Sequence, residues 1–439
     1  MMSAVNKAEL KKFVCSLLDE RKDELIASGE ALLRMPELSF REYKTSAFVS
    51  EYFKKIGLVP RNNIAITGVR AELETGKDGP VLAVMGELDA IIVPNHPFAD
   101  KVTGAAHACG HHAALNAMLG CAGVLSHPEV KKHLSGRISF MATPSEECQD
   151  QPYIAGLIKE KKIQFFSGKS EMIAENEFDD IQIAMMLHAG NSNFTVSGFN
   201  GFVMKRLIFK GKSAHAGAYP EQGVNAVSMM RSAMALIDAQ RDTFRDEDHV
   251  RIHGYIPEGG QAVNVVPDQA VFTVQVRGAS PQAIRDASDK VDRCVHGTAI
   301  AFGGKATVEN IFGFMPLVNY PEFDEIHIRN ITGIVAPGEP FTRGVYRPAS
   351  TDMGDVSMLM PSLHGYFRGF AGTAHTDGFL VTDPVQAYVD SAKILALNAI
   401  DLLFGDAGCG KDIGALPSMM GKDLYLKEMR AFSSSVEYP

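Results

Sequence analysis

The sequence predicts an α/β protein in which a layered domain with a central sheet encloses a second, nested domain. Short apolar runs alternate with helical patterns in the first part of the chain, which is typical of a sheet covered by helices. The middle of the chain follows the order β-α-β-β-α-β, which is a complete ferredoxin-like unit. The length of 439 residues also exceeds one ordinary core.

The first segment begins with helices and continues with buried strands. Apolar residues recur at helical spacing from Leu10 to Leu33, and a second helix fits Thr45–Ile56. Three short apolar runs bounded by polar or turn residues then predict strands, with a helix between the first two. The strands are 81–85, 138–142 and 181–187, and the helix is 113–125.

The nested domain is predicted over residues 199–316. Its strands are 202–210, 249–256, 270–277 and 306–314, and its helices are 223–240 and 282–302. The enclosing domain therefore comprises residues 1–198 and 317–439, with a helix at 384–403. The tail after Phe404 is rich in Gly and Ser and remains unassigned.

Composition excludes several classes of function. The net charge of −9 is not gathered into blocks, and no basic stripe is present for a nucleic acid. No run of 18 apolar residues predicts a membrane span, and the N-terminus lacks the apolar stretch of a secretory signal. Six cysteines without paired spacing indicate reduced thiols. We therefore expect a cytoplasmic protein.

Candidate metal ligands follow the predicted strands. The run His107–His112 contains Cys109 and His111 around a glycine, and thiolate and imidazole are favoured zinc ligands. Glu146 and Glu147 follow one strand, so one carboxylate can bind a metal while the other accepts a proton. His188 ends another strand. Asp89 follows a third, where it can orient a ligand histidine. The carboxyl ends of strands are where such sites gather.

The sequence resembles the zinc-dependent aminoacylase and carboxypeptidase superfamily. It looks most like the amidohydrolase branch, with hippurate, auxin-conjugate and aminobenzoyl-glutamate hydrolases. The resemblance runs from Pro36 to the helix near residue 400 and leaves the tail uncovered. The matching motifs are His107-Ala108-Cys109-Gly110-His111, Glu146-Glu147, Leu187-His188, Lys212-Ser213-Ala214-His215-Ala216, Asn264-Val265-Val266-Pro267-Asp268 and Ser350-Thr351-Asp352 with Gly354-Asp355-Val356-Ser357.

The resemblance implies a role for each matching residue. It implies two divalent transition-metal ions, zinc before manganese, cobalt or nickel, and a metal-dependent cleavage of a small N-acyl amino acid or dipeptide. Glu146 becomes the general base, and the nested domain becomes a lid that forms a homodimer. The implied ligands are Cys109, His111, Glu147, His188 and His375, and the implied substrate-binding residues are His215, Asn264 and Arg277, with His215 also holding the oxyanion.

Two departures and two alternatives accompany this interpretation. His112 stands where the branch has Asp or Asn and could be an extra ligand, and Ser145 follows Pro144 where the branch has Ala. One alternative makes Cys109 a nucleophile with a neighbouring histidine as its base. The other is a non-catalytic binding or regulatory protein on the same scaffold.

Overall fold

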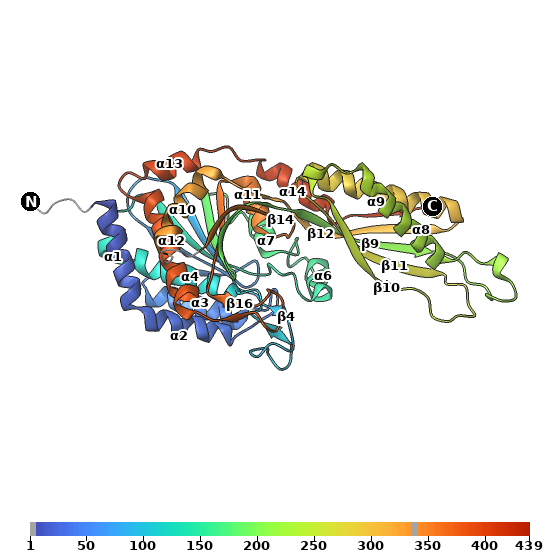
Figure 1. Cartoon of the computed structure of the whole chain (residues 1–439), viewed down its shortest axis with the longest axis horizontal. Helices are drawn as coiled ribbons and strands as arrows, with labels where there is room; N and C mark the ends of the chain where they lie inside the picture. The colour runs from blue at the N-terminus through green and yellow to red at the C-terminus, as the bar shows by residue number, and fades with distance from the viewer. Residues whose placement is uncertain (1–5, 335–339) are drawn as a thin grey trace, which may run out of the picture. The chain divides into compact units, whose positions relative to one another are not determined.

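The structure is a computed structural model that describes residues 6–334 and 340–439 and divides into two units (Figure 1). Among these residues, the first unit runs to Ser197 and continues over Val318–Val345 and Leu359–Met419. The second unit consists of Gly198–Leu317, Tyr346–Met358 and Met420–Pro439. Within the described residues, no helix combines the length and the apolar character needed to cross a membrane.

The larger sheet is mixed, as expected for the fold class. Its order is β1-β2-β6-β3-β7-β15-β8-β13, and β14 pairs with β8. Strands β6, β3, β7 and β15 run parallel, whereas β1 pairs antiparallel with β2, β2 with β6, and β8 with β15. The strands are β1 Pro60–Ile64, β2 Gly68–Glu74, β3 Val81–Glu87, β6 Arg137–Thr143, β7 Ile183–Ala189, β8 Asn193–Phe199, β13 Leu317–Val318, β14 Phe341–Arg347 and β15 Ser362–Phe367.

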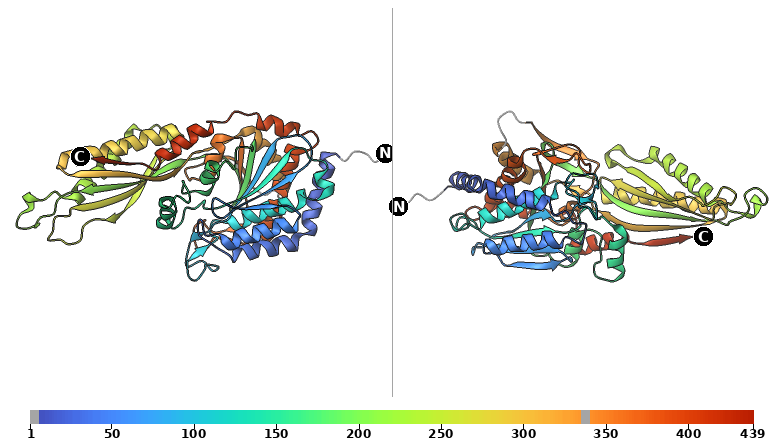
Figure 2. Two further views of the ribbon diagram at one scale, coloured as in Figure 1. Left: turned by 180° about the vertical axis from the view of Figure 1, so that it is seen from behind. Right: turned by 90° about the horizontal axis from the view of Figure 1, so that it is seen from below.

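Helices cover this sheet in two layers. Helices α4 and α12 pack on each other and on the strands, and α1 and α2 pack outside them (Figure 2). The helices of this unit are α1 Lys7–Glu20, α2 Lys22–Leu33, α3 Tyr43–Lys55, α4 His111–Leu125, α5 Pro128–Lys131, α6 Gln151–Lys159, α7 Gly168–Ala174, α10 Pro321–Ile334, α12 Ser391–Leu403 and α13 Gly408–Gly414. Two short hairpins complete it: β4 Ile91–Ile92 with β5 Ala105–Ala106, and β16 Phe370–Ala371 with β17 Leu380–Val381.

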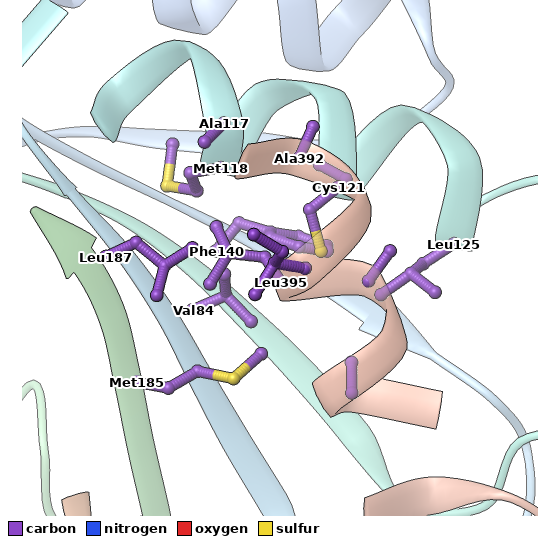
Figure 3. Packing of buried hydrophobic residues seen from close by; sticks show 14 of the residues in the cluster. Val84, Ala117, Met118, Cys121, Leu125, Phe140, Met185, Leu187, Ala392 and Leu395 are labelled. Carbon is purple, nitrogen blue, oxygen red and sulfur yellow. The ribbon is translucent and has the colours of Figure 1, made fainter. Parts of the chain in front are cut away.

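The core lies between the sheet and the inner helices. Strand residues such as Phe140 and Met185 face Met118 on α4 and Leu395 on α12 (Figure 3). All four side chains are fully buried, and burial of each contributes roughly 1.5–3 kcal/mol. The small residues of α4 allow this close approach, because a Cβ at Gly120 would lie 2.8 Å from the Cβ of Ala392. The packing fixes both the strand ends and the start of α4, where the candidate ligands lie.

The second unit has the predicted ferredoxin-like order. Its sheet is antiparallel, with the order β10-β11-β9-β12-β18, and α8 and α9 pack against it. The elements in chain order are β9 Gly201–Lys210, α8 Ala226–Ala239, β10 Arg251–Glu258, β11 Gln269–Gly278, α9 Pro281–Phe302, β12 Lys305–Phe314, α11 Met353–Leu359, α14 Lys422–Ala431 and β18 Ser435–Tyr438.

Two segments that the sequence division gave to the enclosing domain belong to the second unit. Residues 346–358 join it because the Asp355 carboxylate accepts the backbone N–H of Met315. Residues 420–439 join it because β18 adds a fifth strand beside β12. The unassigned tail thus contributes α13 to the first unit and α14 and β18 to the second.

Candidate metal centre

The candidate site lies where the parallel strands of the first unit end. Asp89 follows β3, Glu146 and Glu147 follow β6, and His188 is the penultimate residue of β7. Because these strands run parallel, their carboxyl ends meet at one edge of the sheet, where sites in open α/β sheets form. The sheet order therefore brings together side chains that are far apart in the sequence.

Gly110 makes the turn that brings Cys109 and His111 to this edge. Its φ is 84°, in the left-handed region, and it caps helix α4, which begins at His111. A Cβ on Gly110 would lie 2.3 Å from the Cβ of Ala189. Both the backbone angle and the available space therefore require glycine.

One group of candidate ligands consists of Cys109, His111 and His188. Their ligand atoms lie within 4.8 Å of one another, and Cys109 Sγ is 3.4 Å from His188 Nε2. The side chain of His111 is 1% exposed. This group sits on the start of a helix and the end of a strand, both fixed by the core.

A second group consists of Cys109, Glu147 and His375. Its ligand atoms also lie within 4.8 Å of one another. His375 Nε2 is 3.3 Å from Cys109 Sγ and 3.3 Å from Glu147 Oε1. His375 lies between β16 and β17 with φ of 68°, and its backbone N–H donates to the carbonyl of Ala108. Cys109 is thus common to both groups.

Hydrogen bonds to atoms outside the two groups orient the rings of His111 and His188. Nδ1 of His111 lies 3.1 Å from the Asp89 carboxylate, and Nδ1 of His188 lies 2.8 Å from the carbonyl of Ala189. Both partners are acceptors, so each ring donates its Nδ1 proton to them and points Nε2 towards the groups. Asp89 also accepts the backbone N–H of Glu147. Its expected orienting role therefore has the required geometry.

Burial and one hydrogen bond set the protonation of the donors. Burial lowers the pKa of His188 to about 4 and raises the pKa of the Cys109 thiol well above its ordinary value. Burial opposes ionisation of Glu147, but the hydrogen bond to His375 holds the pKa of Glu147 below its ordinary value. The same hydrogen bond raises the pKa of His375. In His188 and Glu147 these shifts favour neutral imidazole and ionised carboxylate, the forms that bind metals.

The spacing and the chemistry of the donor atoms fit divalent metal ions. Within the part of the chain that the structure describes, the buried atoms Glu87 Oε2 and His111 Nε2 have no hydrogen-bond partner. Two N or O ligands at about 2.0–2.1 Å from a tetrahedral ion lie about 3.3 Å apart. The 3.3 Å separation of His375 Nε2 and Glu147 Oε1 matches that spacing. Thiolate, imidazole and carboxylate together suit zinc and its neighbours.

His112, which sequence analysis left open as an extra ligand, points elsewhere. Its Nε2 lies 3.2 Å from the Tyr388 hydroxyl, and its ring lies against those of His107 and Phe370. Among the described residues, no candidate ligand group includes it. The departure from the family pattern at this position therefore leaves both groups intact.

Glu87 and Lys169 stand at the site although the sequence analysis did not single them out. Glu87 ends β3, forms a buried ion pair with Lys169, and belongs to a third group with His111 and Glu146. Glu146 Oε2 lies 3.9 Å from His111 Nε2. The available signal was the spacing of Glu87 and Asp89, because alternate residues of an extended chain point the same way.

The three residues expected to bind substrate separate into two places within the second unit. His215 and Val265 form a β-bridge, and the Asn264 carbonyl accepts the backbone N–H of Ala216, so His215 and Asn264 lie on adjoining exposed loops. Arg277 lies near the other end of β11, where it donates to the Ser350 hydroxyl. At about 3.3 Å per residue, Arg277 is about 26 Å from the start of β11 at Gln269.

Comparisons with known proteins agree with this fold. Residues 197–299 match the family described as the peptidase dimerisation domain of the M20 peptidases. The chain is 26% identical over 340 residues to an N-acyl-L-amino acid amidohydrolase of Geobacillus stearothermophilus, covering 74% of this chain and 84% of that protein. It is 28% identical over 370 residues to an N-acetyl-L-cysteine deacetylase of Bacillus subtilis, covering 82% of each.

A solved structure shares the fold. It is a dinuclear metal-binding peptidase of the M20 family from Bacillus subtilis, with a TM-score of 0.67 at 20% identity, and the match covers 88% of this chain and 99% of that one. Fold and matches together define a hydrolase of the peptidase and amidohydrolase class. These matches support a place for the chain in the amidohydrolase branch of the M20 metallopeptidases, which it resembles over most of its length.

Proposed function

We propose that this protein hydrolyses the amide bond of a small N-acyl amino acid or dipeptide at a two-metal centre. The observation that carries the proposal is the pair of ligand groups that share Cys109, with Glu146 beside them at the strand ends. Two divalent ions bound there would polarise the amide carbonyl and lower the pKa of water to about 7. The ligands are Cys109, His111, His188, Glu147 and His375.

Glu146 is the proposed general base. It belongs to a group with His111 but to neither of the groups that share Cys109, so it stands beside the proposed ions without being one of their proposed ligands. It takes a proton from the attacking water and returns it to the leaving amine nitrogen. Such proton transfer is worth about 10²–10⁴ in rate. Asp89 holds the ring of His111 and the backbone of Glu147 in place.

The alternative with Cys109 as a nucleophile has less support. An activated thiol needs a lowered pKa, whereas burial raises the pKa of Cys109. The non-catalytic alternative predicts the loss of a ligand or of the base, and all of these residues are present. Related proteins named as an amidohydrolase and a deacetylase also support hydrolysis of N-acyl amino acids.

The experiment that tests this function is a substrate panel. Metal-loaded protein is incubated with N-acyl amino acids and dipeptides, and the release of free amine is measured. At least one class should be hydrolysed, a chelator should abolish the activity, and Zn²⁺, Mn²⁺ or Co²⁺ should restore it. Full activity of the metal-free protein would contradict the proposal.

We also propose that the lid forms a homodimer and that His215 and Asn264 serve the active site of the partner chain. Support comes from the match to a dimerisation domain and from the wide separation of these two residues from Arg277. Among the described strands, the exposed β10 stands at the end of its sheet, so its outer edge can pair with a second copy. His215 would donate to the substrate oxyanion, an interaction worth about 3–4 kcal/mol.

Mixing two inactive variants tests this arrangement. His215→Ala should lower kcat without loss of metal, and Glu146→Gln should do the same for a different reason. Heterodimers formed from both should regain part of the activity, because one of their two sites has an intact base and an intact His215. No recovery in verified heterodimers would rule out sharing across chains.

A further inference from the structure

The loop that follows β6, residues 144–150, carries Glu146 and Glu147 on an unusual backbone; we call it the carboxylate loop. Three of its residues that are not glycine have φ in the left-handed region: Ser145 at 49°, Cys148 at 48° and Asp150 at 60°. Residues other than glycine adopt this conformation at a cost, and it persists only where the surroundings hold it. The contacts that hold this loop therefore set where both carboxylates lie.

Three fully buried side chains accept alternate backbone N–H groups of the carboxylate loop. The acceptors and the residues whose N–H they hold are Glu42 with Ser145 at 2.9 Å, Asp89 with Glu147 at 3.0 Å, and Ser39 with Gln149 at 2.9 Å. The Ser39 hydroxyl also donates to Asp89. Removal of an acceptor leaves a buried N–H unsatisfied, which costs more than the hydrogen bond itself contributes. Of the three acceptors, Glu42 holds the N–H at the start of the loop, one residue before Glu146.

Two carboxylates of the segment that leads into α3 hold different parts of the chain. Glu42 is the N-cap residue of α3, but Glu37 accepts the backbone N–H groups of Lys44 and Thr45 at the start of that helix. Glu42 instead reaches Ser145, which is 103 residues further along the chain. Because an N-cap side chain ordinarily serves its own helix, this long-range contact indicates a different role for Glu42.

Glu42 contacts the loop as a polar group rather than as a charge. Burial, together with the nearby charge of Asp89, raises the pKa of Glu42 to about 8, so the neutral form predominates at pH 7. Oε1 accepts the N–H of Ser145, and Oε2 lies 2.6 Å from the Thr67 hydroxyl. Glutamine has the shape of the neutral side chain and an oxygen for the same N–H, whereas leucine has no acceptor.

We propose that Glu42 is a positioning residue for the general base: by accepting the N–H of Ser145, it fixes the left-handed backbone from which Glu146 projects. The inference rests on the proposed function, which makes Glu146 the base. Without the acceptor, the backbone of Ser145 relaxes and the next residue moves with it. A displacement of about 1 Å can cost about 10²-fold in rate.

The test compares Glu42→Leu with Glu42→Gln and with Glu37→Leu. Glu37→Leu is the matched control, because it removes a carboxylate of the same segment that holds α3 rather than the carboxylate loop. For each metal-loaded protein, kcat and KM are measured with a substrate that the wild type hydrolyses. Amide hydrogen exchange of residues 144–150 is measured in the metal-free proteins, so that one readout does not depend on activity.

Glu42→Leu should lower kcat by about 10²-fold with little change in KM, because the base acts in the transition state rather than in substrate binding. Its carboxylate loop should exchange amide hydrogens faster than that of the wild type. Glu42→Gln should match the wild type in kcat and in exchange, and Glu37→Leu should lower the melting temperature without changing either. Wild-type kcat or wild-type loop exchange in folded Glu42→Leu would overturn the proposal, as would an equal fall of kcat in Glu37→Leu.

A smaller variant keeps the test decisive if Glu42→Leu does not fold. Glu42→Ala leaves room for water, which can satisfy the N–H of Ser145 but is not fixed to the chain. Its loop should therefore still exchange faster, and its kcat should still fall. If the wild type hydrolyses no member of the substrate panel, the proposed function fails. If the wild type is active and folded Glu42→Ala has wild-type kcat and loop exchange, only the role of Glu42 fails.

Discussion

The two ligand groups that share Cys109 are built from different kinds of structure. His111 and His188 lie on a helix and a strand, and each ring has an outer hydrogen bond that fixes its orientation. Glu147 and His375 lie on loops, and the side chain of His375 is 51% exposed. The first group is positioned by the core, whereas the second depends on one loop that packs against Ala108.

This difference predicts that the two ions behave differently. Ligands on packed elements with outer hydrogen bonds are held in place before the ion binds, which strengthens binding. Loops open locally at low free-energy cost, so an ion that depends on them exchanges more easily. We call the ion of the group Cys109, His111 and His188 the inner ion, and the ion of the group Cys109, Glu147 and His375 the outer ion. We expect the inner ion to be retained and the outer ion to be lost first.

The largest expected effect is a difference in kcat and metal content between variants of the adjacent carboxylates Glu146 and Glu147. Glu146→Gln should lower kcat by about 10²–10⁴ because it removes the base, while the protein keeps both ions. Glu147→Gln should lose one ion, because it removes a ligand of the outer group. Metal analysis and steady-state kinetics on the same samples check this. Equal metal loss in both variants would mean that the roles are wrongly assigned.

A second effect should appear in the kinetics of metal removal. With a chromophoric chelator in excess, the wild type should release its ions in two phases, and His375→Ala should lack the fast phase because its outer ion is already absent. The variant should retain about one ion per chain. His133→Ala is a suitable control, because His133 is half-buried in the same unit, stacks on Phe404 and belongs to neither ligand group. A single phase in the wild type would remove the distinction between the groups.

The smallest effect concerns His327, a buried histidine of the same unit that is not a candidate ligand. Burial lowers the pKa of His327 to about 4, and Nδ1 accepts a hydrogen bond from Asn398. Its neutral form is favoured in the folded chain, so the free energy of unfolding is unaffected by this group above pH 6.5. The free energy of unfolding falls between pH 6.5 and 4, where only the unfolded chain takes up the proton. Below pH 4 this contribution levels off.

The loss attributable to His327 over that window is about 3 kcal/mol. Denaturant unfolding at pH 7 and pH 4.5 should show a smaller loss in His327→Gln than in the wild type. Equal losses in the two proteins would show that His327 does not carry this pH dependence, and would leave it to other buried histidines such as His364.

Much of the fold could be predicted because its elements carry strong local patterns. The strand β6 and the ferredoxin-like order follow from apolar runs and helical spacing, and both are present. Strand β18 could not be predicted, because its sequence Ser-Val-Glu-Tyr is short and exposed and is a strand only through pairing with β12. Long-range pairing of this kind leaves little local signal.

The site residues also divide into those that a local motif marks and those that no local pattern marks. Cys109, His111 and the Glu146-Glu147 pair could be proposed from local motifs, whereas His375 could be proposed only from the family resemblance because no local pattern marks it. Glu87 was missed because its partner Lys169 lies 82 residues away in the sequence. A buried ion pair becomes visible only when the fold brings both charges together.

The central claim is amide hydrolysis at two metal ions that differ in their protein ligands. The most direct test adds Zn²⁺ or Co²⁺ in steps to metal-free protein and measures bound ions and amine release in the same samples. The first equivalent should fill the inner group with little activity, and hydrolysis should rise as the second equivalent binds. Maximal hydrolysis at one equivalent, or with no metal bound, would contradict the account.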